Sequence, residues 1–243
     1  MRLTLSSAVL SNRLLTLSKV LNSKNSLQIL ECILFEVNNG VLTLTASDKE
    51  NEMKTQIQLD ESDADGKFAI SSRTIIDAVK ELPEQPITLE IDMATYNVKV
   101  IYQNGDYNFT AQNADEFPQV QAIEENAATI KIGSAVLTDN ITRTLFATAN
   151  EEIRPVMNGI YFDLTPEALA IVASDGHKLV RNKVFSIKDE NAKSFILPKK
   201  PATILKNVLA KDDSEVEIVF DNKNAKDAIR TTHLSSRQTT LAS

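Results

Sequence analysis

Tryptophan is absent from this 243-residue sequence, which also contains only one cysteine, two histidines and six glycines. The single cysteine, Cys32, can form neither an internal disulfide bond nor a cysteine metal cluster. It lies in the apolar run of residues 32–35, so we expect a buried small side chain rather than a redox group. The glycines form neither a GxxxxGKS/T nor a GxGxxG pattern, so the sequence gives no support for a phosphate-binding loop.

Long hydrophobic runs are also missing. No stretch approaches the roughly 20 consecutive apolar residues that a membrane-spanning helix needs. Arg13 and Lys19 interrupt the apolar positions of the N-terminal segment, which is unlike the core of a signal peptide. We therefore expect a cytoplasmic protein with no membrane partner. With 42% hydrophobic and 24% charged residues, the chain has the composition of a folded protein.

Positive charge is scarce relative to negative charge. The net charge is −7, from 26 basic and 33 acidic residues, which argues against a protein that coats nucleic acid with its whole surface. The four stretches predicted below as helices nevertheless carry a net positive charge together, so the rest of the chain is acidic. Lysines on a helix often form only a solvated face. The alternative is a surface that contacts the phosphates of a polyanion without reading its sequence.

The sequence repeats itself at an offset of 127 residues. With this shift and no gap, apolar residues meet apolar residues over about ninety positions. Two copies of one domain explain the shared register, and two unrelated αβ segments with the same periodicity are the alternative. Identical pairs include residues 8–10 with 135–137, 46–48 with 173–175, and 90–91 with 217–218.

Each copy has the pattern of an α+β domain. The turn Asn38-Asn39-Gly40 between two alternating stretches predicts a β-hairpin. Pro83 ends a predicted helix that a serine at position 71 or 72 caps. We expect two helices packed on a mostly antiparallel sheet in each copy. Apolar spacings of three and four place these helices over 7–22 and 73–82 in the first copy, and over 134–149 and 199–211 in the second.

The first domain is expected over residues 1–125 and the second over 129–225. The agreement between the copies stops at Ala225, because residues 225–229 do not alternate as the corresponding strand should. Residues 226–243 are rich in Ser, Thr and Gln and show no strand pattern. The sequence therefore predicts an incomplete second domain, shortened by truncation or a changed reading frame, and then an atypical polar tail. A native polar extension is the alternative.

His177 is the most conspicuous candidate for chemistry. It follows Asp175-Gly176 directly after an apolar strand, which is first of all the pattern of a tight turn, with a binding surface as the second interpretation. A hydrolase or nuclease that uses His177 and nearby carboxylates stays open, although no recognisable catalytic set surrounds it. A structural fragment without activity is the remaining possibility. The acidic clusters 60–65 and 212–213 lack the ligand pattern of a calcium loop, so we expect solvated turns and no metal.

Four strings together resemble one family, the bacterial DNA sliding clamp, which is the beta subunit of DNA polymerase III. The resemblance covers residues 1 to about 225 and implies duplicated clamp domains, no catalytic site and no cofactor. It implies a ring of two head-to-tail subunits with three similar domains each, in which helices line a central hole. Double-stranded DNA threads the hole, and the ring tethers the replicative DNA polymerase to confer processivity. The strings are Leu42 to Asp48, Asp115 to Pro118, Arg154 to Gly159, and Ala173 to Leu179.

Two groups of site residues follow from this resemblance. A hydrophobic groove in the family accepts short clamp-binding motifs of the polymerase, the clamp loader and repair proteins. Its second-domain part matches Met157, Ser174, Gly176, His177, Lys178 and Leu179. The residues expected to face DNA are Lys24, Arg154, Arg13, Lys19, Arg73, Lys80, Arg143, Lys199, Lys200 and Lys206.

The sequence departs from the family after Ala225, and the third clamp domain is absent from it. The rest of the groove wall comes from those parts in the family, so we expect weaker peptide binding. The family joins the first domain of one subunit to the third domain of another. We therefore expect that the shortened chain does not close the usual ring.

Overall fold

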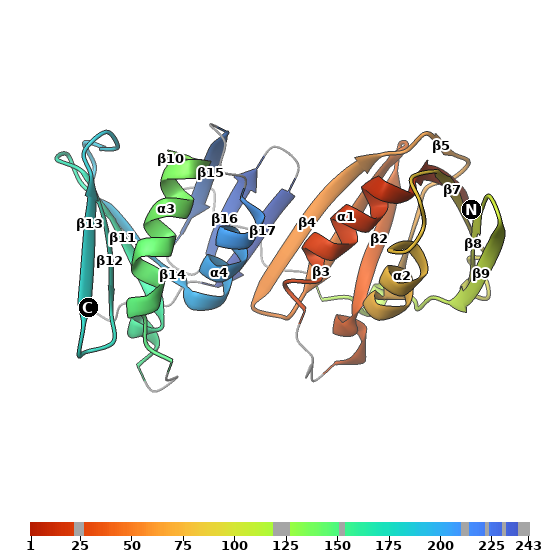
Figure 1. The fold of residues 1–243 in the computed structure, drawn as a ribbon, viewed down its shortest axis with the longest axis horizontal. Helices are drawn as coiled ribbons and strands as arrows, with labels where there is room; N and C mark the ends of the chain where they lie inside the picture. Colours follow the sequence, from red (N-terminus) through yellow and green to blue (C-terminus); the bar gives the residue numbers. More distant parts are fainter. Residues whose placement is uncertain are drawn as a thin grey trace. The chain divides into compact units, whose positions relative to one another are not determined.

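The computed structural model describes residues 1–21, 27–118, 127–150, 154–209 and 214–221, together with the backbone of 224–229 and 232–237. The chain divides into two compact units, residues 1–120 and 121–243. Each is an α+β unit with one pair of helices (Figure 1). Among the residues described, no helix is long and apolar enough to cross a membrane.

The first unit contains two antiparallel sheets and two helices, α1 and α2, which contact each other. In one sheet the strand order is β5-β1-β7-β8-β9, and in the other it is β4-β3-β2-β6. Helix α1 contacts β1 of one sheet and β3 and β4 of the other, so it lies between them. The elements are β1 (Arg2–Ser6), α1 (Ser7–Leu17), β2 (Cys32–Asn38), β3 (Val41–Ser47), β4 (Asn51–Gln58), β5 (Glu61–Ser62), β6 (Gly66–Ser71), α2 (Ser72–Val79), β7 (Pro86–Ile91), β8 (Asn97–Tyr102) and β9 (Gly105–Thr110), with 3-10 helices at Gln28–Glu31 and Ala114–Glu116.

Local sequence explains the start of α1 and the first hairpin. The Ser6 hydroxyl accepts a hydrogen bond from the backbone N–H of Val9, which satisfies one of the free donors at the helix start. The hairpin between β2 and β3 is confirmed, because Asn39 and Gly40 have φ of 50° and 76° and form its two-residue loop. The first helix is shorter than predicted, since its regular part ends at Leu17.

The second unit repeats this plan. Its sheets have the strand orders β10-β15-β16-β17 and β13-β12-β11-β14. Helices α3 and α4 contact each other, α3 also contacts β10, β12 and β13, and α4 contacts β11 and β14. The elements are β10 (Ala128–Gly133), α3 (Ser134–Thr144), β11 (Gly159–Leu164), β12 (Leu169–Ser174), β13 (Leu179–Val184), β14 (Lys193–Pro198), α4 (Lys199–Val208), β15 (Glu215–Phe220), β16 (Asn224–Ile229) and β17 (Thr232–Arg237), with 3-10 helices at Leu145–Ala147 and Pro155–Met157.

The repeat extends beyond the point at which the sequence prediction ended it. Strands β16 and β17 begin and end 127 residues after β8 and β9, and each pair is antiparallel in the same register. The prediction of a strandless polar tail after Ala225 is therefore wrong as far as Arg237. Backbone hydrogen bonds to β15 and between β16 and β17 form these strands without the apolar alternation that the prediction required.

One sequence match is also corrected. Leu89 pairs with Leu3, whereas Ile218 pairs with Ile130, which is the counterpart of Leu3. Ile218 is therefore the structural counterpart of Leu89 and not of Ile91, because β15 lies two residues later than an ungapped alignment requires. The shift is reversed before β16, so the loops on either side of β15 absorb it.

The acidic segment 60–65 is only partly a turn. Glu61 and Ser62 form β5, which pairs with β1 at the end of a sheet. The Asp63 carboxylate accepts a hydrogen bond of 2.6 Å from the backbone N–H of Arg2. This segment therefore extends the sheet by one short, charged strand, a common protection against edge-to-edge association. Residues 212–213 lie outside the described residues.

Each unit has a stacked pair of phenylalanines in its core. The ring centroids of Phe35 and Phe68 are 5.3 Å apart, and those of their repeat counterparts Phe162 and Phe195 are 4.8 Å apart. All four side chains are buried. The pairs that the sequence shift matched thus occupy equivalent core positions.

The cores differ at one equivalent position. Cys32 begins β2 and is buried with Ala69 in a small cluster, whereas its counterpart Gly159 begins β11. A Cβ atom on Gly159 would lie 2.5 Å from Ile196 Cγ2 and 2.9 Å from the Leu197 carbonyl oxygen. Ile196 is the counterpart of Ala69. The first unit therefore combines a larger residue with a small one, and the second unit combines glycine with isoleucine.

The thiol of Cys32 should be unreactive in the folded protein. Burial raises its pKa from 9.0 to about 11, and the nearby carboxylate of Glu31 raises it further. At pH 8 we expect little reaction with Ellman's reagent before unfolding and full reaction in concentrated urea.

The same shift predicts a pH dependence of stability. The unfolded chain releases the thiol proton near pH 9 and the folded chain only near pH 11. The free energy of unfolding should therefore fall as pH rises through this window. Urea titrations of Cys32→Ala should lack this part of the decrease, and an identical decrease in both proteins would contradict the assignment.

Candidate functional site

The predicted turn after β12 is built around Asp175. Its Oδ1 accepts hydrogen bonds from the backbone N–H groups of His177, at 3.0 Å, and Lys178, at 2.9 Å. The Ser174 hydroxyl donates to the Lys178 carbonyl oxygen at 2.9 Å and accepts from the Gly176 N–H at 3.2 Å. Gly176 has φ of +89°. The turn interpretation of this string is confirmed by these contacts.

The first unit contains the same turn at the equivalent place. Asp48 Oδ1 accepts from the N–H groups of Glu50 and Asn51, and the Ser47 hydroxyl accepts from the N–H of Lys49. Lys49 has φ of +81°, close to that of Gly176. The Ser-Asp pair therefore belongs to the fold of both units and does not by itself mark a functional site.

The side chains that the two turns carry are different. Gly176, His177 and Lys178 stand where the first unit has lysine, glutamate and asparagine. The next residue, Leu179, is 66% exposed, while its counterpart Glu52 is buried. An exposed leucine beside a basic turn is thus specific to the second unit.

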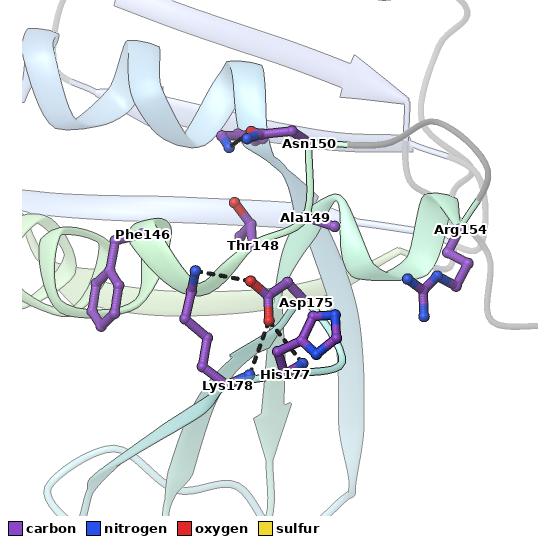
Figure 2. Close-up of a pocket in the computed structure, with 9 residues that line it drawn as sticks. Phe146, Thr148, Ala149, Asn150, Arg154, Asp175, His177 and Lys178 are labelled. Carbon is purple, nitrogen blue, oxygen red and sulfur yellow. Dashed lines mark hydrogen bonds and ion pairs between the residues drawn. The ribbon is translucent and has the colours of Figure 1, made fainter.

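A pocket of about 270 Å³ lies beside this turn. Figure 2 shows Arg154 and Phe146 on opposite sides, with Asp175, His177 and Lys178 between them. The pocket brings together Arg154 and Lys199, predicted to face DNA, and His177 and Lys178, predicted to bind peptide. Its full lining is Phe146, Thr148, Ala149, Asn150, Arg154, Asp175, His177, Lys178 and Lys199.

The pocket carries excess positive charge. Lys178 Nζ lies 2.8 Å from Asp175 Oδ2, so these two charges compensate each other. The hydrogen bonds from Lys178 and the backbone N–H groups hold the pKa of Asp175 well below its usual range. Lys199 Nζ donates to the amide oxygen of Asn150, which is uncharged. Arg154 and Lys199 are therefore the cations of this lining that no described lining carboxylate neutralises.

The other predicted groove residues lie around this pocket. Met157 is half-buried, and its carbonyl oxygen accepts from the Ala149 N–H at 2.8 Å, which ties the 3-10 helix at Pro155–Met157 to a lining residue. Ser174 and Gly176 shape the turn, and Leu179 begins β13. The sequence prediction missed Phe146, which is 63% exposed. An aromatic residue at an exposed position directly after a predicted helix was the available signal.

The predicted DNA-facing residues of the helices are partly paired. Arg73 and Lys80 share one carboxylate, since Asp77 lies 3.9 Å from Arg73 Nε and 2.8 Å from Lys80 Nζ. Arg143 pairs with Asp139 at 2.7 Å. Arg13 is half-buried on α1, Lys19 is exposed just after it, and Lys24 lies outside the described residues. Helix α4 differs, because it carries Lys199, Lys200 and Lys206 and no acidic residue.

Family comparisons agree with the duplicated fold. The DNA polymerase III beta subunit N-terminal domain matches residues 1–121, and the central domain of the same subunit matches residues 131–239. Together these matches take in most of the chain. The chain belongs to the DNA polymerase III beta-subunit family. The central-domain match includes the stretch that forms β16 and β17.

Individual relatives extend this assignment. The beta sliding clamp of Halalkalibacterium halodurans is 27% identical over 212 residues, which are 83% of this chain and 55% of that protein. The beta sliding clamp of Buchnera aphidicola subsp. Rhopalosiphum padi is 28% identical over 238 residues, which are 96% of this chain and 64% of that protein. The chain thus spans between about half and two thirds of the length of these beta-subunit relatives.

Solved structures show the same fold. The DNA polymerase III subunit beta of Pseudomonas aeruginosa superposes with a TM-score of 0.93 at 24% identity, over 100% of this chain and 66% of that chain. The beta subunit of Thermotoga maritima gives a TM-score of 0.86 at 25% identity, over 99% of this chain and 65% of that chain. The predicted α+β fold with duplicated clamp domains is confirmed.

The hydrolase or nuclease alternative is not supported. The carboxylate nearest His177 in sequence is Asp175, whose oxygens are occupied by Lys178 and by backbone N–H groups of the turn. Asp48 has the same structural role in the first unit of this beta-subunit chain. Within the described residues, no group of three or more His, Cys, Asp or Glu side chains could hold a metal ion.

Proposed function

We propose that this chain acts as a non-catalytic DNA sliding clamp in the cytoplasm, which holds a replicative polymerase on duplex DNA. The family assignment supports the proposal, and the relatives that match over most of the chain are named beta sliding clamps. The single observation that carries the peptide-binding part is the pocket beside the Asp175 turn, where exposed apolar and basic side chains meet. A Pseudomonas aeruginosa clamp structure contains bound griselimycin, so a related fold does take a ligand.

The DNA-binding part of the proposal relies on the helices. A clamp that slides past every sequence needs phosphate contacts and no base contacts, and sparse lysines and arginines suit this requirement. The acidic remainder of the chain disfavours nonspecific adhesion elsewhere on the surface. Helix α4 is the strongest candidate of the described helices for such contacts, since it carries three lysines and no acidic residue.

The decisive test is primer extension on primed circular DNA with the cognate polymerase and clamp loader. We expect the chain to lengthen the products of a single binding event. Products of unchanged length would favour a structural fragment with neither activity. The expectation that the shortened chain does not close a two-subunit ring stays a prediction, and native mass spectrometry of the purified chain would contradict it by showing a closed dimer on DNA.

Replacing His177 by alanine separates the clamp proposal from the enzyme alternative. We expect the affinity for a labelled peptide from the polymerase's clamp-binding segment to fall by a few-fold, about 1 kcal/mol, because the substitution removes one polar group beside the pocket. Fluorescence anisotropy measures this change.

The matched control is Glu50→Ala, which alters the equivalent position of the first-unit turn and should leave peptide affinity unchanged. A nuclease or esterase activity that the purified chain shows and His177→Ala lacks would overturn the clamp proposal.

A further inference from the structure

The pocket beside the Asp175 turn contains two cations from different elements. Arg154 precedes the 3-10 helix at Pro155–Met157, and Lys199 is the first residue of α4. Among the described residues no carboxylate lies within ion-pair distance of either side chain, whereas Lys178 in the same pocket is paired with Asp175. The pocket therefore offers positive charge to a ligand and not only to its own walls.

Gly176 allows Arg154 to approach the turn. A Cβ atom at position 176 would lie 3.3 Å from Arg154 Nη1, so any other residue would crowd the guanidinium. The positive φ alone does not demand glycine here, because Lys49 adopts φ of +81° in the equivalent turn. The close approach is a second reason for glycine at this position, and it places the guanidinium beside the turn.

The first unit supplies an internal comparison. The counterparts of Arg154, His177 and Lys199 are Leu27, Glu50 and Ser72. The same backbone turn thus exists there without the cations. Positive charge at this place is a property of the second-unit pocket and not a requirement of the fold.

The chemistry of the lining indicates the ligand. A guanidinium presents a planar fork of donors that matches a carboxylate, and a lysine ammonium nearby adds a second charge-assisted interaction. Phe146, exposed on the other side of the pocket, provides an apolar surface. With about 270 Å³, the pocket suits one or two side chains rather than a whole cofactor. This combination fits a peptide with a carboxylate next to an apolar side chain.

We propose that Arg154 and Lys199 bind a carboxylate of the docked partner peptide and so select acidic clamp-binding segments, rather than contact DNA. This inference rests on the proposed peptide-binding function and assigns the ligand chemistry of the same site. The carboxylate can be an aspartate or glutamate side chain or the C-terminal carboxylate of the partner, and the test distinguishes these sources.

The test uses the full chain and a short labelled polymerase peptide made in matched forms. One pair has aspartate or asparagine beside the apolar residues, and a second pair has a free or an amidated C-terminus. For the wild-type chain we expect removal of the recognised carboxylate to weaken binding about tenfold, the size of one charge-assisted hydrogen bond. In Arg154→Gln the same change should weaken binding less than about twofold, because the partner of the carboxylate is gone. Lys199→Gln should give an intermediate result.

Arg181→Gln is the control, since this exposed arginine on β13 does not line the pocket and should keep the full tenfold preference. Equal affinity of the wild-type chain for all four peptides would overturn the carboxylate assignment while leaving the clamp function in place. No binding of any peptide would overturn the peptide-binding function itself. A loss of duplex-DNA affinity in Arg154→Gln, with the peptide preference unchanged, would return Arg154 to the DNA-facing group and also overturn the assignment.

Discussion

Replacing Gly159 by alanine should destabilise the second unit by about 1–3 kcal/mol, the range for inserting atoms into a packed core. The new methyl group would lie 2.5 Å from Ile196 Cγ2 and 2.9 Å from the Leu197 carbonyl oxygen, so both a buried side chain and the backbone must move. Urea unfolding should show a lower midpoint with an unchanged slope.

A second substitution tests the cause. In an Ile196→Ala background, the added cost of Gly159→Ala should fall below about 1 kcal/mol, since one of the two close neighbours has been removed. Gly133→Ala is the control for a general effect of glycine replacement, because its Cβ would have its nearest neighbour at 3.9 Å, on Val136. Equal costs of Gly159→Ala in both backgrounds would show that the contact with Ile196 does not matter.

The second large effect concerns the basic residues of α4. The double substitution Lys200→Glu with Lys206→Glu should lower the affinity for a labelled linear duplex about 10- to 100-fold at low salt. It should also reduce the slope of log affinity against log salt by about two, because each lysine neutralises one phosphate. Both residues lie on a helix with no acidic side chain, so the helix itself presents a net positive charge to the phosphates. Filter binding over a salt series measures both quantities.

The control for this prediction has the same change of charge elsewhere in the unit. Lys183→Glu with Lys188→Glu alters two exposed residues at and beyond β13 and should change DNA affinity much less. Similar losses in both double variants would mean that only net charge matters, and the assignment of α4 to DNA would be wrong. Circular dichroism should confirm that α4 variants stay folded.

The sequence was sufficient to predict the duplicated α+β fold, since both signals are local. Spacings of three and four indicated the helices, and Asn39-Gly40 indicated the first hairpin. It was not sufficient for β16 and β17, because these strands form through backbone pairing with their neighbours and show little apolar alternation. The two-residue shift of β15 was invisible as well, since apolar residues still met apolar residues.

The candidate site was predictable in part. The string around His177 located the turn, but the sequence could not show that Arg154 and Lys199 converge on it from elements before and after it. Nor could it show that Arg73 and Lys80 share Asp77, which leaves less free positive charge on α2 than two basic residues suggest. Such pairings depend on side-chain positions in three dimensions. The assignments of individual DNA-facing and groove residues therefore stay predictions.

The exchange of small and large residues between the two cores has a consequence for recombination between the halves of the gene. A hybrid that joined β2 of the first unit to β14 of the second would place Cys32 against Ile196 and overfill the space. The reverse hybrid would place Gly159 against Ala69 and leave a void. Since diversification has made single strands incompatible, shuffled descendants should survive only when β2 and β6, or β11 and β14, are inherited together.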